Sequence, residues 1–227
     1  MDKELFDKLV ERKQDVLIHF EETLGLSIDD AEFLITPPAD DERYSIDIAI
    51  FPPSEDCPYY LATTVGLSCY KFNPMFARCE LFMVLPKNYK INMDKEDNSW
   101  PIDILHEFSY LLFYNKMTPI PNQVYKVLED GHFKSTKATD IIVVYPEMFD
   151  LDVLDEEIEG TFTRFFQVVP ITPEQTQKAE EIGVRRFIDY DLHNTEGPDM
   201  VVSWAPKTNK KMEQIIKHNE DSLKGKK

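Results

Sequence analysis

The sequence has few glycines and cysteines. Its 227 residues include 7 Gly and 3 Cys, against 15 Pro. The cysteines, Cys57, Cys69 and Cys79, are odd in number and form no C-x-x-C pair, which argues against a disulfide framework or a thiolate zinc site. The shortage of glycine argues against flexible linkers, so we expect one domain over residues 1–227.

Long apolar runs are also absent. Nowhere do about 18 apolar residues follow one another, as a membrane-spanning helix requires. Charges interrupt the N-terminal stretch MDKELFDKLVERKQD, where a signal peptide would have its apolar region. We therefore expect a soluble, cytoplasmic protein.

Positive charge is scarce. The chain has 25 Lys and Arg against 42 Asp and Glu, which gives a formal net charge of −17. Such a field repels phosphate backbones and anionic lipids, so we expect neither nucleic acid nor a membrane as a partner. It attracts a basic protein. The alternative, that the acidity only keeps the protein soluble, stays open.

Catalytic and cofactor motifs are missing as well. The stretch HEFSY resembles H-E-x-x-H, but Tyr110 stands where the second zinc ligand would be. The segment Gly66-Leu67-Ser68 begins like G-x-S-x-G and lacks the second glycine. No phosphate-binding glycine motif occurs, and the five histidines are dispersed. We predict no catalytic, cofactor-binding or metal-binding residue and no cofactor.

The stretch PPSEDCP around Cys57 is the remaining candidate for a reactive loop. A nucleophilic thiolate needs a base or a cation beside it, whereas Glu55 and Asp56 disfavour the charged form. Its prolines cannot donate the hydrogen bonds of a sheet and suit a turn. We interpret the stretch as a turn between two strands.

Apolar periodicity predicts the elements of the first half. Apolar residues three and four apart predict a helix over residues 3–24, and Gly25 is expected in the left-handed conformation after it. Strict alternation over 43–51 predicts a half-buried strand. With the β-branched and aromatic runs 58–66 and 79–85, this strand should form an antiparallel meander. A short strand is expected at 31–36.

The second half combines helices and strands. Ser99-Trp100-Pro101 predicts the start of a helix that runs to residue 114. Strands are predicted at 140–146 and 161–169, and a helix with a first-turn proline at 173–183. Further predicted elements are a helix at 185–192, a surface loop at 147–160, and a C-terminal strand and helix within 198–223.

Four segments between about Phe33 and Asp191 resemble the suppressor of fused domain family. RYSIDIAIFPPSEDCPYYLATTVGLS resembles its strand, proline-containing turn, aromatic strand and Thr-x-Gly-x-Ser ending. CELFMVLPKNYKI resembles its Glu-Leu segment, and NSWPIDILHEFSYLL its Trp-Pro helix start. FFQVVPITPEQTQKAEEIG resembles its last strand and acidic helix. The four occur in the family's order.

The resemblance implies an α/β (α+β) fold, a single compact domain with a mixed or largely antiparallel sheet flanked by helices. The suppressor-of-fused-like core would cover about 33–191. It also implies a small, single-domain, bacterial-type member with a non-enzymatic, protein-binding role. Animal members sequester a transcription factor and carry Gly-Asp-His where this chain has Asn122-Gln123-Val124, so no binding residue is transferred.

Acidic residues between two predicted strands are the candidate partner-binding surface: Asp150, Asp152, Asp155, Glu156, Glu157 and Glu159. Some members of the family have been proposed as immunity proteins, and an acidic inhibitor would suit a basic toxin. The alternatives are an enzyme or a small-ligand binder with an unrecognised site. The partner's identity and the oligomeric state stay open.

Overall fold

The computed structural model describes residues 3–34, 45–70, 72, 78–87, 89, 96–127, 138–146, 153–155 and 162–192. For residues 3–9, 96–98 and 153–155 it describes the backbone alone. The predicted C-terminal strand and helix within 198–223 lie outside these ranges. No helix in the described ranges is long and apolar enough to cross a membrane.

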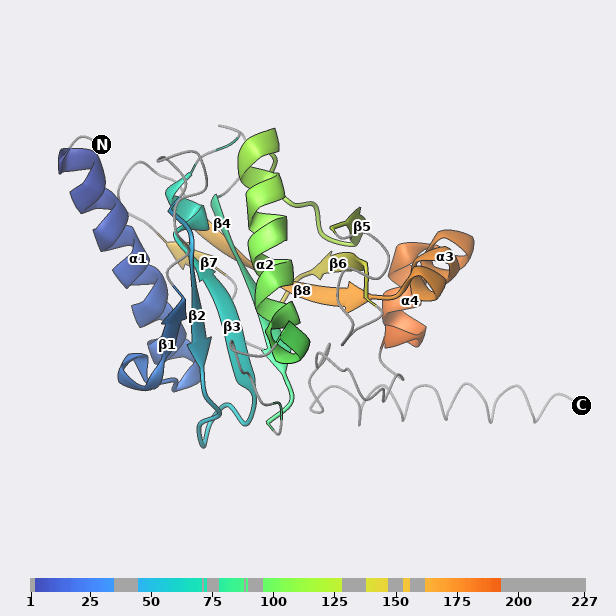
Figure 1. The fold of residues 1–227 in the computed structure, drawn as a ribbon, viewed down its shortest axis with the longest axis horizontal. Helices are drawn as coiled ribbons and strands as arrows, with labels where there is room; N and C mark the ends of the chain where they lie inside the picture. The colour runs from blue at the N-terminus through green and yellow to red at the C-terminus, as the bar shows by residue number, and fades with distance from the viewer. Residues whose placement is uncertain are drawn as a thin grey trace, which may run out of the picture.

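A mixed sheet of eight strands organises the described part of the chain (Figure 1). Its order is β1-β2-β3-β4-β8-β6-β5, and β7 pairs with β8 beside this path. The strands are β1 (Glu32–Leu34), β2 (Asp47–Phe51), β3 (Tyr60–Val65), β4 (Arg78–Leu85), β5 (Gln123–Lys126), β6 (Asp140–Val144), β7 (Val153–Asp155) and β8 (Phe162–Ile171).

Strand directions confirm the predicted fold class. Strands β2, β3 and β4 form the expected antiparallel meander. The pairing of β4 with β8 is parallel, and the other pairings are antiparallel. The helices are α1 (Lys3–Leu24), α2 (Glu96–Asn115), α3 (Pro173–Ile182) and α4 (Val184–Tyr190), with short 3-10 helices η1 (Ile28–Asp30) and η2 (Leu67–Cys69).

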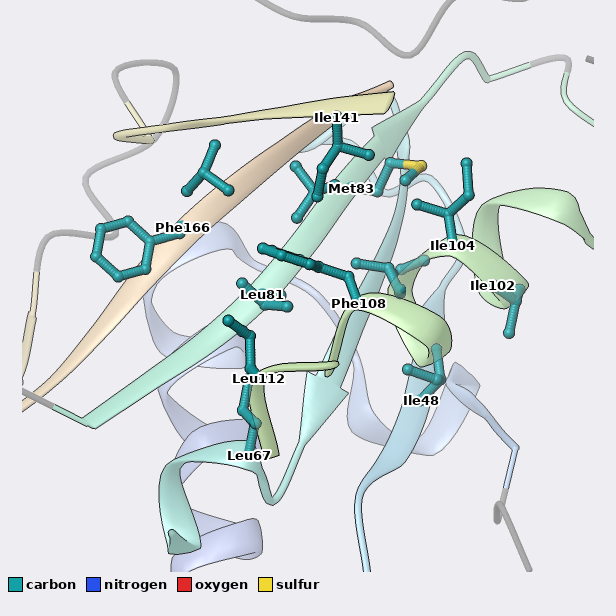
Figure 2. Close-up of a cluster of buried hydrophobic side chains, with 14 of the residues drawn as sticks. Ile48, Leu67, Leu81, Met83, Ile102, Ile104, Phe108, Leu112, Ile141 and Phe166 are labelled. Atoms are coloured by element: carbon teal, nitrogen blue, oxygen red, sulfur yellow. The ribbon is translucent and has the colours of Figure 1, made fainter. Parts of the chain in front are cut away.

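Helices cover both faces of the meander. One apolar cluster joins Val16 and Phe20 of α1 to one face, and a second joins α2 to the other. Figure 2 shows Phe108 and Leu112 of α2 close to Leu81 of β4. Helices α3 and α4 lie at the opposite end of the molecule from α1, near β6 and β8 (Figure 1).

The prediction that the strand within 43–51 is half-buried was wrong. Its alternation is correct, because Ile48 and Ile50 face α2 while Ala49 and Phe51 face α1. Both faces are nevertheless covered, and Ala49 and Phe51 are 0% exposed. A local pattern cannot show that a helix from the N-terminus packs on the second face.

Strand β8 connects the hydrophobic clusters. Phe165 belongs to the cluster under α1, and Phe166 and Val168 belong to the cluster under α2. Val169 and Ile171 pack with α3 and α4. Because β8 packs in all three clusters, the residues at its N-terminal end have a fixed position relative to the sheet.

Several helix boundaries were predicted correctly. Helix α1 has the expected limits, and Gly25 follows it with φ 62°. Helix α3 begins with Pro173 after Thr172, whose side chain accepts a hydrogen bond from Gln175 N–H in a capping box. These boundaries depend on local capping, which the sequence displays directly.

Other boundaries differ from the prediction. Helix α2 begins at Glu96, so Pro101 lies inside it instead of in the first turn. Trp100 and Ile104, 3% and 0% exposed, anchor this turn in the core, which offsets the hydrogen bond that a proline removes. Strands β5 and β7 were not predicted. They are short, and β7 lies in the segment expected to be a loop.

Candidate functional site

The structure describes one residue of the predicted acidic surface, Asp155, which lies beside the N-terminal end of β8. Asp155 is in β7 and pairs with Phe162 in the antiparallel register of β7 and β8. The five other predicted residues lie outside the described ranges: Asp150, Asp152, Glu156, Glu157 and Glu159. The segment therefore connects the end of β6 to the start of β8.

Three side chains that the sequence analysis missed lie at this end of β6 and β8. Tyr145 and Phe162 are 46% and 36% exposed. Between them, Arg164 places its guanidinium carbon 5.1 Å from the Phe162 ring centre and its Nη1 donates to the Tyr145 hydroxyl at 3.5 Å. We call Tyr145, Phe162 and Arg164 the aromatic patch.

The aromatic patch lies on the same face of β8 as buried residues of the core. Residues two apart on a strand share a face, so Phe162 and Arg164 lie on the same face as Phe166. Phe166 is 4% exposed and packs in the cluster under α2 (Figure 2). Its ring centre is 5.8 Å from that of Tyr145. The buried Phe166 therefore supports the Tyr145 ring of the patch.

A sheltered carboxyl group, which the enzyme alternative requires, is present at Glu80 in β4. Glu80 is 0% exposed. The hydroxyls of Thr64 and Ser68 donate to it at 2.5 and 2.7 Å. The backbone N–H groups of Gly66, Leu67 and Ser68 donate at 3.0, 3.3 and 2.9 Å. Three successive amides thus form an anion-binding nest around a group of the same chain.

Gly66 makes this turn possible. Its φ of 111° is unfavourable for residues with a side chain, and an added Cβ would lie 2.9 Å from the carbonyl oxygen of Ser45. The guanidinium groups of Arg12 and Arg78 donate to the Ser68 carbonyl oxygen at 3.2 and 3.0 Å. The Gly-x-Ser sequence therefore serves to fasten a turn, and Ser68 is fully buried.

Burial governs the ionisation of the groups around Glu80. Desolvation raises the pKa of Glu80, and the hydrogen bonds from Thr64 and Ser68 oppose this rise. Burial, and secondarily the charge of Glu80, raises the pKa of Cys69 to about 12. Cys69 therefore stays a thiol at neutral pH and is a poor nucleophile. The arrangement suits a structural role better than acid–base chemistry.

The PPSEDCP stretch is a turn, as predicted. It joins the antiparallel strands β2 and β3. Ser54 N–H donates to the Cys57 carbonyl at 2.8 Å, and Cys57 N–H donates to the Ser54 hydroxyl at 3.0 Å. Cys57 is 2% exposed, and burial raises its pKa. These features disfavour a reactive thiolate.

His19 contacts an aromatic side chain of the core. Its ring stacks on Phe165 at 4.9 Å between centres, and burial lowers its pKa. Among the described residues, no group of three or more His, Cys, Asp or Glu side chains is arranged to hold a metal ion.

The chain is similar to known proteins in both sequence and fold. Residues 42–203 match the family model described as Suppressor of fused protein (SUFU). A search of curated proteins found no match.

Three solved structures share the fold. A protein described as a SUFU homolog from Neisseria gonorrhoeae FA 1090 has a TM-score of 0.61 at 12% identity, covering 86% of this chain and 96% of its own. The Sufu-Fu complex gives 0.56 at 14% identity, with 79% and 84% covered. Drosophila Suppressor of Fused gives 0.54 at 14% identity, with 92% and 53% covered, so this chain spans about half of that protein.

Proposed function

The chain belongs to the suppressor of fused family, and from this premise we propose that it is a non-enzymatic protein-binding or regulatory module. The family match carries the proposal. One structural neighbour, the Sufu-Fu complex, is a complex of Sufu with Fu, which supports protein binding as the activity.

The chemistry of the described residues supports the same function. The buried carboxyl group of Glu80 accepts hydrogen bonds from Thr64, Gly66, Leu67 and Ser68 of its own chain, so its role is structural. The exposed rings of Tyr145 and Phe162 suit contact with another polypeptide, since aromatic and arginine side chains are enriched at protein interfaces.

The specific role that we propose is that of a bacterial, cytoplasmic immunity protein which neutralises a basic toxin. The net charge of −17 supports it, because opposite fields accelerate encounter and a few desolvated contacts then slow dissociation. The acidic residues between Asp150 and Glu159 are the proposed contact surface.

Affinity capture followed by titration calorimetry tests the proposal. The tagged protein should retain one specific partner from a lysate of its source, and the purified pair should bind. The reversal Glu156→Lys and Glu157→Lys should weaken binding at least about tenfold, because it replaces attraction with repulsion. Co-expression with a toxin encoded next to this chain should restore growth if the role is immunity.

The matched control reverses Glu180 and Glu181, exposed acids of α3. Each reversal replaces two adjacent glutamates and changes the net charge by the same amount. A difference in affinity between the two variants therefore reports the position of the charges. Equal affinities of the two variants for the partner would show that the acidic segment is not part of the contact surface. Substrate turnover by the purified protein would contradict a non-enzymatic function.

A further inference from the structure

Two exposed rings and one arginine form a continuous surface at the ends of β6 and β8. Arg164 contacts Phe162 through its guanidinium and Tyr145 through its Nη1. Tyr145 in turn contacts Phe166, which is fixed in the core. The patch is therefore held in place by side chains that folding already orders.

Such a surface is costly to leave in water. Exposed apolar groups that gather together instead of occurring singly mark interaction sites in many proteins. Aromatic side chains fixed before binding lose little conformational freedom when a partner arrives. Tyr145 and Phe162 are both exposed. Contacts with Phe166 and Arg164 hold the Tyr145 ring, and the contact with Arg164 holds the Phe162 ring.

The charge of the adjoining segment indicates the kind of partner. Residues 147–160 carry seven acidic residues and no Lys or Arg, and they connect the end of β6 to the start of β8. Asp155, the one acidic residue of this segment that the structure describes, pairs through its backbone with Phe162 of the patch. One arginine, Arg164, offsets a small part of this charge.

We propose that the aromatic patch is the docking site for a basic segment of a protein partner, in which arginine or lysine alternates with apolar residues. The apolar residues would pack on the rings of Tyr145 and Phe162, and a cation would stack on one of these rings. Arg164 over Phe162 shows that this ring accepts a guanidinium. The proposal rests on the protein-binding function and names the surface and the chemistry of that partner.

Fluorescence anisotropy with a labelled peptide of four Arg-Leu repeats tests the proposal on the full chain. The peptide should bind, and its Glu-Leu counterpart should not. The double variant Tyr145→Ala, Phe162→Ala should bind the Arg-Leu peptide at least about tenfold more weakly, as expected for anchor residues. The control Tyr190→Ala removes an exposed ring of α4, 62% exposed, and should bind like the native chain.

Hydrogen exchange on the native protein provides a second measurement, so the result does not depend on the double variant folding. Bound Arg-Leu peptide should protect the amides of residues 145 and 162–164. Three results would overturn the proposal: protection of other amides, no binding of the Arg-Leu peptide, or an equal loss of peptide affinity in the double variant and in Tyr190→Ala. None of them would affect the capture of a partner as evidence for protein binding. Conversion of a native dimer to a monomer by the double variant would show a second copy as the occupant and overturn it as well.

Discussion

The carboxyl group of Glu80 holds the buried turn between β3 and β4 through hydrogen bonds. It accepts hydrogen bonds from two hydroxyls and three amides of residues 64–68. A buried donor that loses its acceptor costs about 1 to 3 kcal/mol. The turn therefore depends on one side chain that is distant in sequence.

We predict that Glu80→Ala lowers the free energy of unfolding by at least about 3 kcal/mol, because several buried donors lose their acceptor. Glu80→Gln should cost less, since it keeps one acceptor oxygen. Urea denaturation measures both. Glu107→Ala, an exposed change on α2, should stay within about 0.5 kcal/mol of the native chain. Native stability in Glu80→Ala would show that the donors find other acceptors.

His19 should make stability depend on pH. Burial lowers its pKa below the ordinary value of 6.5, so below that value the unfolded chain binds the proton more readily than the folded one. Its contribution is therefore complete above about pH 7.5 and decreases as the pH falls to about 5.5.

The variant His19→Phe retains a ring beside Phe165 and removes the titration. Its free energy of unfolding, measured by urea denaturation, should rise relative to the native chain as the pH falls from about 7.5 to about 5.5. A constant difference over that interval would show that the histidine has the same pKa in both states.

At the scale of elements, β2 is the clearest test of the layered architecture. A strand buried on one face tolerates a charge on its other face, whereas β2 has α2 over Ile48 and α1 over Ala49. We predict that Ile48→Asp and Ala49→Asp each lower the free energy of unfolding by at least about 3 kcal/mol, because each buries an unpaired charge.

Thermal and urea denaturation measure these changes. Phe33→Asp in β1 is the matched control, since Phe33 is 43% exposed in the same sheet. It should lower the free energy of unfolding by less than about 1 kcal/mol. An Ala49→Asp variant with native stability would place that face of β2 in water.

At the scale of the whole molecule, the charge of −17 should control association. We predict that the association rate with a basic partner decreases several-fold between about 0.05 and 0.5 M NaCl, because salt screens the attraction. The dissociation rate should change less. Stopped-flow fluorescence measures both rates, and an association rate that salt leaves unchanged would contradict electrostatic steering.

The sequence by itself determined the elements whose signals are local. The periodicity of α1, the capping of α3 by Thr172 and the left-handed Gly25 each depend on residues within a turn or two. The alternation of β2 likewise assigned its two faces correctly. Local sterics and hydrogen bonding fix these features wherever the segment packs.

Tertiary structure alone decided what each element packs against. The parallel pairing of β4 with β8, the burial of both faces of β2 and the turn held by Glu80 join segments that are distant in the chain. The aromatic patch is a further case, because Tyr145 and Arg164 come together only when β6 and β8 pair. A sequence pattern records whether a residue prefers burial, and only the folded chain determines which residue lies beside it.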